Sequence, residues 1–155
     1  MKKYDKLDMM ILKELRKDGK TPYRKLAEKL GAHPNTLMQR IKRLEKEGVI
    51  QNYAAQIDYS KIGFGIQAVV MIRIKKRGLD DPHLLKEIAR LPQVTSLYAT
   101  TGGYDCIATI HAKDKDDLLD VLQRIQSDEK VLRTTSQMIL VTYKNPSEFN
   151  PLEQE

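Results

Sequence analysis

The stretch TPYRKLAEKLGAHPNTLMQRIKRLEKEG, residues 21–48, sets the architecture of the first third of the chain. Apolar residues recur in it every three or four positions, first at Leu26, Ala27 and Leu30 and then at Leu37, Ile41 and Leu44. This spacing predicts two amphipathic helices, the first capped by Thr21 and the second opened by Pro34. Only the tripeptide GAH separates them, which is typical of a helix-turn-helix.

A third helix precedes these two, with an apolar stripe of Ile11, Leu12 and Leu15. If the apolar residues of the helix that Pro34 opens face inward, the other side of this helix carries polar and basic side chains that suit a DNA major groove. Base contacts come from the N-terminal part of such a helix, so we expect them from Asn35, Thr36 and Gln39. Arg40, Arg43 and Lys46 are expected to contact phosphates, and Lys42 shares the exposed side. The alternative is an ordinary three-helix bundle with a basic surface.

Charge is divided unevenly along the 155 residues. Residues 1–52 carry 14 Lys and Arg against 7 Asp and Glu, a net charge of +7, whereas the remaining residues carry 13 against 14. This asymmetry favours a polyanion-binding N-terminal module joined to a near-neutral domain, although solvated helix faces are also often charged.

Several classes of protein are disfavoured by composition. The single cysteine, Cys106, excludes an internal disulfide framework and a multi-cysteine zinc site, and indicates a reducing cytoplasm. We find no signal-peptide pattern and no apolar run of the ~18 residues that a membrane span needs. The three histidines lack metal-ligand spacing, and no catalytic set is evident. We therefore expect no enzyme, cofactor, metal or membrane partner.

After residue 50 the spacing of the apolar residues changes from that of helices to that of strands. Residues 51–58 have the composition of a strand, and we expect strands at 66–74, 94–101, 106–112 and 131–143. One helix is predicted to begin at Asp81 and Pro82, and another to follow the capping residue Asp114. This order predicts a ferredoxin-like βαββαβ domain within an α+β chain, with both helices on one sheet face. Its bare face would hold Val69 and Met71 with one alternate set of the last strand, a candidate oligomer contact. That set is either Met138 and Leu140 or Ile139 and Val141.

The predicted domains are a helix-turn-helix domain over 1–50, a hinge strand and linker over 51–65, a ferredoxin-like domain over 66–144 and a polar tail over 145–155. Between two strands lies TTGGYD, residues 100–105. A phosphate-binding loop is disfavoured, because no helix follows and no lysine lies nearby. A hairpin turn that uses Gly102 and Gly103 is sufficient, and the wall of a small-molecule pocket stays open as a second role.

The chain resembles the Lrp/AsnC (feast/famine) family of prokaryotic transcription regulators up to about residue 143. The resemblance is carried by RIKRLEKEGVI at 40–50, by Tyr53, Asp58 and Gly63 in register after it, by KIGFG and by TGGYD. It implies a winged-type DNA-binding domain, a hinge strand, and a ferredoxin-like domain for effector binding and oligomerisation. Members form dimers, often octamers, and many respond to amino acids. The family usually has serine at position 33, where this chain has His33, a poorer helix cap.

The same resemblance implies an effector site around the glycine-rich turn, where dimers meet. Backbone N–H groups near Gly102 and Gly103 would hold a carboxylate and Asp105 an ammonium group. The residues implied are Thr101, Gly102, Gly103, Tyr104 and Asp105 from the turn and Thr134, Thr135 and Ser136 from the last strand.

Together these observations predict a sequence-specific DNA-binding transcription regulator, dimeric or larger, modulated by a small molecule that we expect to be an amino acid. Its partners would be double-stranded DNA, other copies of itself and the effector. Two alternatives stay open: an architectural protein that compacts DNA with weak sequence preference, and an amino-acid-binding regulatory subunit of a metabolic enzyme.

Overall fold

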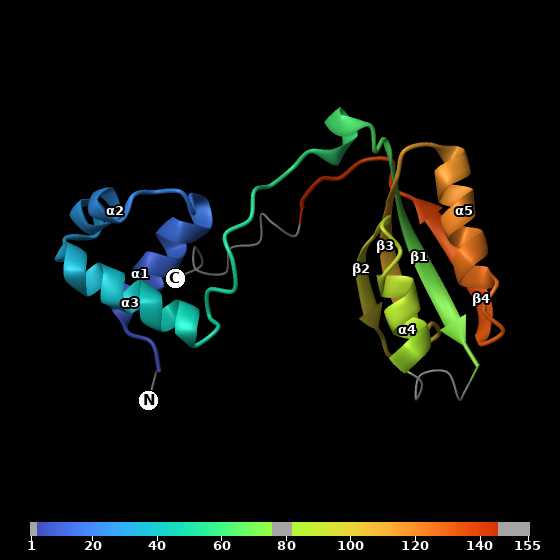
Figure 1. Ribbon diagram of the computed structural model, residues 1–155, viewed down its shortest axis with the longest axis horizontal. Coiled ribbons are helices and arrows are strands. Elements are labelled where there is room, and N and C mark those ends of the chain that lie inside the picture. Colours follow the sequence, from blue (N-terminus) through green and yellow to red (C-terminus); the bar gives the residue numbers. More distant parts are fainter. Residues whose placement is uncertain (1–2, 76–81, 146–155) are drawn as a thin grey trace. The chain divides into compact units, whose positions relative to one another are not determined.

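A computed structural model describes residues 3–75 and 82–145, which form two compact units, one up to Gln56 and the other Ile57–Tyr143 (Figure 1). The predicted helix start at Asp81 and almost all of the predicted polar tail lie outside the described residues.

The first unit is a bundle of α1 (Lys6–Lys17), α2 (Tyr23–Leu30) and α3 (Pro34–Lys46), as predicted. Its core is made of the apolar residues that recur along the three helices: Ile11, Leu15, Leu26, Ala27, Leu37, Ile41 and Leu44. Gly31 ends α2 in the left-handed conformation, with φ 62°. The predicted cap at Thr21 is wrong, because Pro22 occupies the N-cap position and the Thr21 hydroxyl donates to Asp18 Oδ2 at 3.0 Å.

The second unit is a four-stranded antiparallel sheet with two helices. Its elements follow the predicted order: β1 (Ile66–Ile74), α4 (Pro82–Ala89), β2 (Val94–Ala99), β3 (Cys106–Ala112), α5 (Lys115–Gln126) and β4 (Val131–Met138). A short 3-10 helix, η1 (Tyr59–Ile62), precedes β1. The strands are arranged β2-β3-β1-β4, with the first and last strands of the motif paired. The α+β, ferredoxin-like prediction is confirmed (Figure 1).

Alternation along β1 and β3 places the core on one face of this sheet. Alternate residues of both strands are buried together with side chains of α4 and α5: Ala68, Val70, Ile72, Cys106, Ala108, Ile110, Leu84, Ile88, Leu118, Val121 and Ile125. Both helices therefore cover the same face. Asp114 caps α5 as predicted, its Oδ1 accepting from Asp117 N at 2.9 Å.

The opposite sheet face carries Val69 and Met71, as predicted. Val69 pairs with Gln137, and Ile139 N continues the ladder by donating to Gln67 O at 2.8 Å. Residues directly opposite each other share a face. The sequence left open whether Met138 and Leu140 or Ile139 and Val141 share this face. The register favours Ile139 and Val141.

Two segments differ from the predicted strands. Residues 51–58 form no strand, since no other described segment exchanges ladder hydrogen bonds with their backbone, and the described part of the first unit has helices alone. The last strand ends at Met138, opposite Ala68, rather than at residue 143. Ile139 N still donates to Gln67 O, but β1 begins at Ile66 and its register leaves no partner for the residues after 140. Leu140 and Tyr143 are consequently 90% and 94% exposed.

The turn between β2 and β3 depends on one glycine. Gly102 has φ 117°, whereas Gly103 lies outside the positive-φ region, and a Cβ at either position would meet no atom within 4 Å. Any cost of a side chain at Gly102 is therefore conformational rather than steric crowding.

We predict that Gly102→Ala lowers the free energy of unfolding of the second unit by about 1–3 kcal/mol, the cost of holding a side chain in this backbone region. Gly103→Ala is the matched control and should be neutral or stabilising by about 0.5 kcal/mol. Urea titration with hydrogen exchange of β2 and β3 measures both. Equal destabilisation by the two variants would contradict the conclusion that the turn needs a glycine at position 102 alone.

Candidate nucleic-acid interface and ligand pocket

Helix α3 presents an exposed polar stripe along one side. Asn35, Gln39, Lys42 and Lys46 are spaced by four, three and four residues, and all are exposed. This spacing places them on a single side of a helix. Thr36, at the margin, is exposed as well. Lys42 and Lys46 form no ion pair with an acidic side chain in the described part of the chain, so their charge faces solvent.

The start of α3 is fixed by its local sequence. Pro34 occupies the first turn, where the missing N–H costs no hydrogen bond. His33 is the N-cap residue, and its Nδ1 accepts a hydrogen bond from Asn35 N at 3.3 Å. Histidine thus supplies a cap at the position where serine is usual. The side chain of Asn35 is left to project from the helix beside Gln39.

Arg40 and Arg43 lie beside this stripe and are bound within the bundle. Arg40 Nη1 donates to Asp8 Oδ1 at 3.1 Å and also pairs with Asp5 Oδ2, and Arg43 Nη2 donates to Asp8 Oδ2 at 2.5 Å. Hydrogen bonds to Asp5 and Asp8 raise the pKa of the Arg40 guanidinium. The amide of Asp8 and the Arg40 guanidinium lower the pKa of Asp5. The expected phosphate contacts of Arg40 and Arg43 stay predictions, but in this structure both side chains already have acidic partners.

Asp8 was not anticipated as a functional residue. It is 1% exposed, and the helical repeat of α1 places it on the same side as Ile11 and Leu15. An acidic residue in phase with an apolar stripe is the signal that could have identified it, since a buried charge requires a partner.

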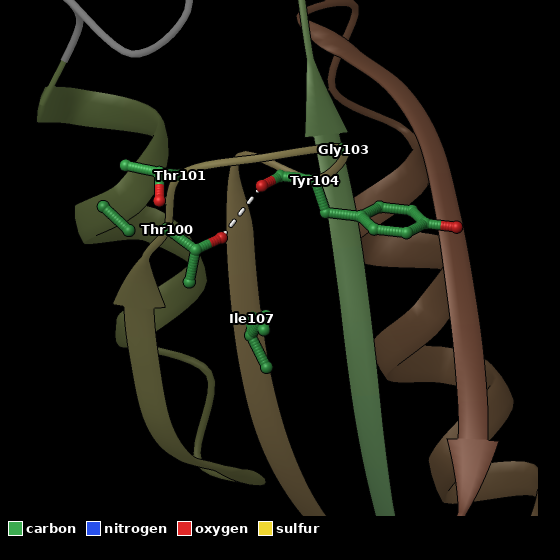
Figure 2. Close-up of a pocket in the computed structure, with 6 residues that line it drawn as sticks. Thr100, Thr101, Gly103, Tyr104 and Ile107 are labelled. Atoms are coloured by element: carbon green, nitrogen blue, oxygen red, sulfur yellow. Dashed lines mark hydrogen bonds between the residues drawn. The ribbon is translucent and has the colours of Figure 1, made fainter.

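The glycine-rich turn borders a shallow, open depression of about 580 Å³. Figure 2 shows its wall, which the turn and the adjoining ends of β2 and β3 supply. Its lining residues are Ala99, Thr100, Thr101, Gly103, Tyr104 and Ile107. The turn is held by Thr100, whose N–H donates to Asp105 O and whose hydroxyl donates to Tyr104 O, both at 2.8 Å.

Tyr104 connects this turn to the far edge of the sheet. Its ring crosses β1 towards β4 (Figure 2), and its hydroxyl lies 3.1 Å from Thr135 Oγ1. Met71 is the register partner of both Ile107 and Thr135, so these residues share the face that the helices leave open. The depression is therefore part of the open sheet face.

The residues expected at the effector site are only partly brought together. Thr101, Gly103 and Tyr104 line the depression, and Thr135 is reached through Tyr104. Gly102, whose role is conformational, does not line it, and neither does Asp105, whose Oδ2 accepts from Ile74 N at 2.7 Å.

The other two expected residues lie on the opposite face of β4. Thr134 pairs with Ile72 and binds Gln126 of α5, and Ser136 pairs with Val70, so both are in register with helix-facing residues. Ala99, Thr100 and Ile107 line the depression without having been expected. Ile107 could have been found by counting alternate positions from Asp105 along the strand.

Other chemistries find little support in the described ranges 3–75 and 82–145. They hold no group of three or more His, Cys, Asp or Glu side chains that could bind a metal ion. No helix among them is long and apolar enough to cross a membrane. Cys106 is buried, and its burial raises the pKa of the thiol, which disfavours a reactive thiolate.

Comparisons with known proteins match both units. Residues 4–51 match a winged helix-turn-helix DNA-binding family, and residues 67–149 match the Lrp/AsnC ligand binding domain. The HTH-type transcriptional regulator FL11 of Pyrococcus furiosus is 31% identical over 94% of this chain and 95% of its own length.

Two solved structures are similar over nearly the whole chain. The structure of Escherichia coli AsnC has a TM-score of 0.81 and 27% identity, and covers 92% of this chain and 94% of its own. A transcriptional regulator from Neisseria meningitidis, solved as a complex with L-Met, has a TM-score of 0.86 and 26% identity, and covers 92% and 93%. With its helix-turn-helix bundle and its ferredoxin-like ligand-binding domain, this chain belongs to the Lrp/AsnC family of DNA-binding transcription regulators.

Proposed function

We propose that this regulator reads double-stranded DNA sequence-specifically through the exposed stripe of α3, and that an amino acid bound at the TTGGYD turn modulates that binding. The observation that carries the DNA-binding part is the stripe itself. Asn35 and Gln39 stand exposed near the N-terminus of α3, and Lys42 and Lys46 continue the same side without acidic partners among the described residues. Amides suited to adenine edges thus precede cations suited to phosphates.

The regulator acts as a dimer or a larger assembly in this proposal. The open sheet face supplies the contact, with Val69, Met71 and Ile107 only half-buried in the single chain and Tyr98 62% exposed. Two recognition helices of a dimer would enter successive major grooves about 34 Å apart, which sets the spacing of half-sites. The regulator would work in the cytoplasm.

An amino-acid effector is supported by the chemistry of the depression and by the L-Met complex of the Neisseria relative. The depression offers hydroxyl groups, the backbone of the glycine turn and the apolar side chain of Ile107. Arg73 and Arg133 lie directly opposite each other on the same sheet face, next to the pair of Met71 and Thr135. Two neighbouring guanidinium groups favour a ligand that carries a carboxylate.

We predict that Gln39→Ala relaxes base preference at one position of the site, with a loss of discrimination of about 1–3 kcal/mol. Lys42→Gln should weaken binding to every sequence and reduce the slope of log K against log salt by about 0.9. Titrations of a site selected from a random pool and of a scrambled duplex measure both effects. Lys86→Gln, the same charge change on an exposed residue of α4, is the control and should leave both quantities unchanged.

Footprinting separates this function from DNA compaction. Discrete, phased protection supports the regulator, whereas uniform coverage would favour the architectural alternative. Absence of binding even at low salt, where counterion release favours binding most, would point to the regulatory subunit of an enzyme.

For the effector, we predict that Tyr104→Phe weakens amino-acid binding about tenfold, because the hydroxyl that bonds Thr135 and fixes the ring over β1 is lost. Calorimetry against the twenty amino acids, starting with L-methionine, identifies the ligand and measures the loss. Tyr98→Phe is the matched control, since Tyr98 lies on the same face but does not line the depression. Equal losses in both variants would argue against a site at the turn.

A further inference from the structure

Asp8 is the one charged side chain that is fully buried in the described part of the chain. Its carboxylate accepts three hydrogen bonds: Oδ1 from Arg40 Nη1, and Oδ2 from Arg43 Nη2 and from the backbone N–H of Asp5 at 3.0 Å. In return, the Asp5 carboxylate accepts from Asp8 N at 2.9 Å and pairs with Arg40. We call these four side chains, Asp5, Asp8, Arg40 and Arg43, the α1–α3 clamp.

The clamp is neutral overall, with two acidic and two basic side chains. If Arg40 and Arg43 turned from Asp8 to a phosphate, Asp8 would be a buried carboxylate without a counter-charge. Breaking a buried ion pair by removal of one partner is strongly unfavourable. Arg43 Nε is shielded from solvent and has no hydrogen-bond partner among the described residues, so Arg43 is held in the clamp through Nη2. By contrast, Lys42 and Lys46 are exposed and can contact phosphate without any rearrangement.

The clamp also defines how α3 is rotated about its own axis. Arg40 and Arg43 are three residues apart and reach the same carboxylate, on the side of α3 next to the exposed stripe. The apolar contacts of Leu37, Ile41 and Leu44 are non-directional, whereas guanidinium–carboxylate hydrogen bonds fix both distance and angle. A helix anchored at two points one turn apart presents a single set of side chains to the groove.

We propose that Asp8 is the positioning residue of the recognition helix, and that Arg40 and Arg43 act on DNA through Asp8 rather than by contacting phosphate. This inference rests on the proposed DNA-binding function. It assigns the phosphate contacts of α3 to Lys42 and Lys46, and it makes the discrimination between sequences depend on a residue that DNA does not touch.

The sharpest test compares Asp8→Asn with Asp5→Asn in the full chain. Both remove one negative charge, and asparagine at position 5 remains a good helix cap. Asp8→Asn should bind the selected site about tenfold more weakly, because misplacing one base contact costs about that factor in affinity. The ratio of its affinities for the selected site and for a scrambled duplex should fall as well. Asp5→Asn should weaken binding to the selected site by less than Asp8→Asn does, because Asp5 is half-exposed and bonds only one arginine.

The opposite result overturns the inference. If Arg40 and Arg43 serve phosphate, loss of the Asp8 charge frees them, so both duplexes should bind more tightly and with a steeper salt dependence. Hydrogen exchange of residues 34–46 reports whether α3 stays folded in each variant.

Arg43→Gln decides the matter even if Asp8→Asn does not fold. Its salt slope should match that of the unaltered chain while preference for the selected site falls, whereas Lys42→Gln should lose about 0.9 from the slope and keep the preference. A slope reduced equally by both variants would overturn the positioning role. A chain that binds neither duplex would overturn the proposed function itself, and this inference with it.

Discussion

The buried carboxylate of Asp8 constrains the whole N-terminal unit. A charge removed from water needs partners, and α3 provides them in Arg40 and Arg43. Once these arginines are turned towards α1, the next side of α3 is left to Asn35, Gln39, Lys42 and Lys46, which have no comparable partners within the bundle. The acidic residue thereby separates the basic residues of one helix into two groups. One group stabilises the bundle and the other remains available for a polyanion.

A different constraint organises the second unit. Strand alternation gives each sheet two faces, and the two crossover helices cover only one of them. At the end of β1, Asp105 continues the ladder beyond β3, with its N–H bonded to Ile72 O and its carboxylate to Ile74 N. This arrangement ties the turn to the sheet edge and leaves Gly103 and Tyr104 at the surface of the depression. Asp105, which the family resemblance implied as a partner for an ammonium group, thus has a structural role in the chain.

Periodicity predicted most of the fold, because a core requires the same apolar spacing that the sequence displays. The three helices of the bundle, the strands β1 and β3 and the cap at Asp114 all follow from local patterns. Where a strand ends depends on its neighbour, so neither the unpaired segment 51–58 nor the end of β4 at Met138 could be read locally. The site was predicted less well for the same reason. Arg40 looks like any exposed basic residue until the position of Asp8 is known, and Thr134 and Thr135 differ only in the face that the register gives them.

The position of the depression bears on how a ligand could influence DNA binding. Tyr104 lies across β1 and bonds Thr135, so the turn, the depression and the open apolar face form one continuous surface. Under the proposed function, effector binding and the contact between copies share this surface. A ligand that favours one arrangement of copies over another changes which recognition helices can reach DNA together, through its differential affinity for the two assemblies. Such coupling needs no pathway through the interior of either unit. Coupling through contacts between copies also accounts for the small net charge of the ligand-binding domain, because that domain would contact other copies of itself. The excess positive charge of residues 1–52 would face DNA.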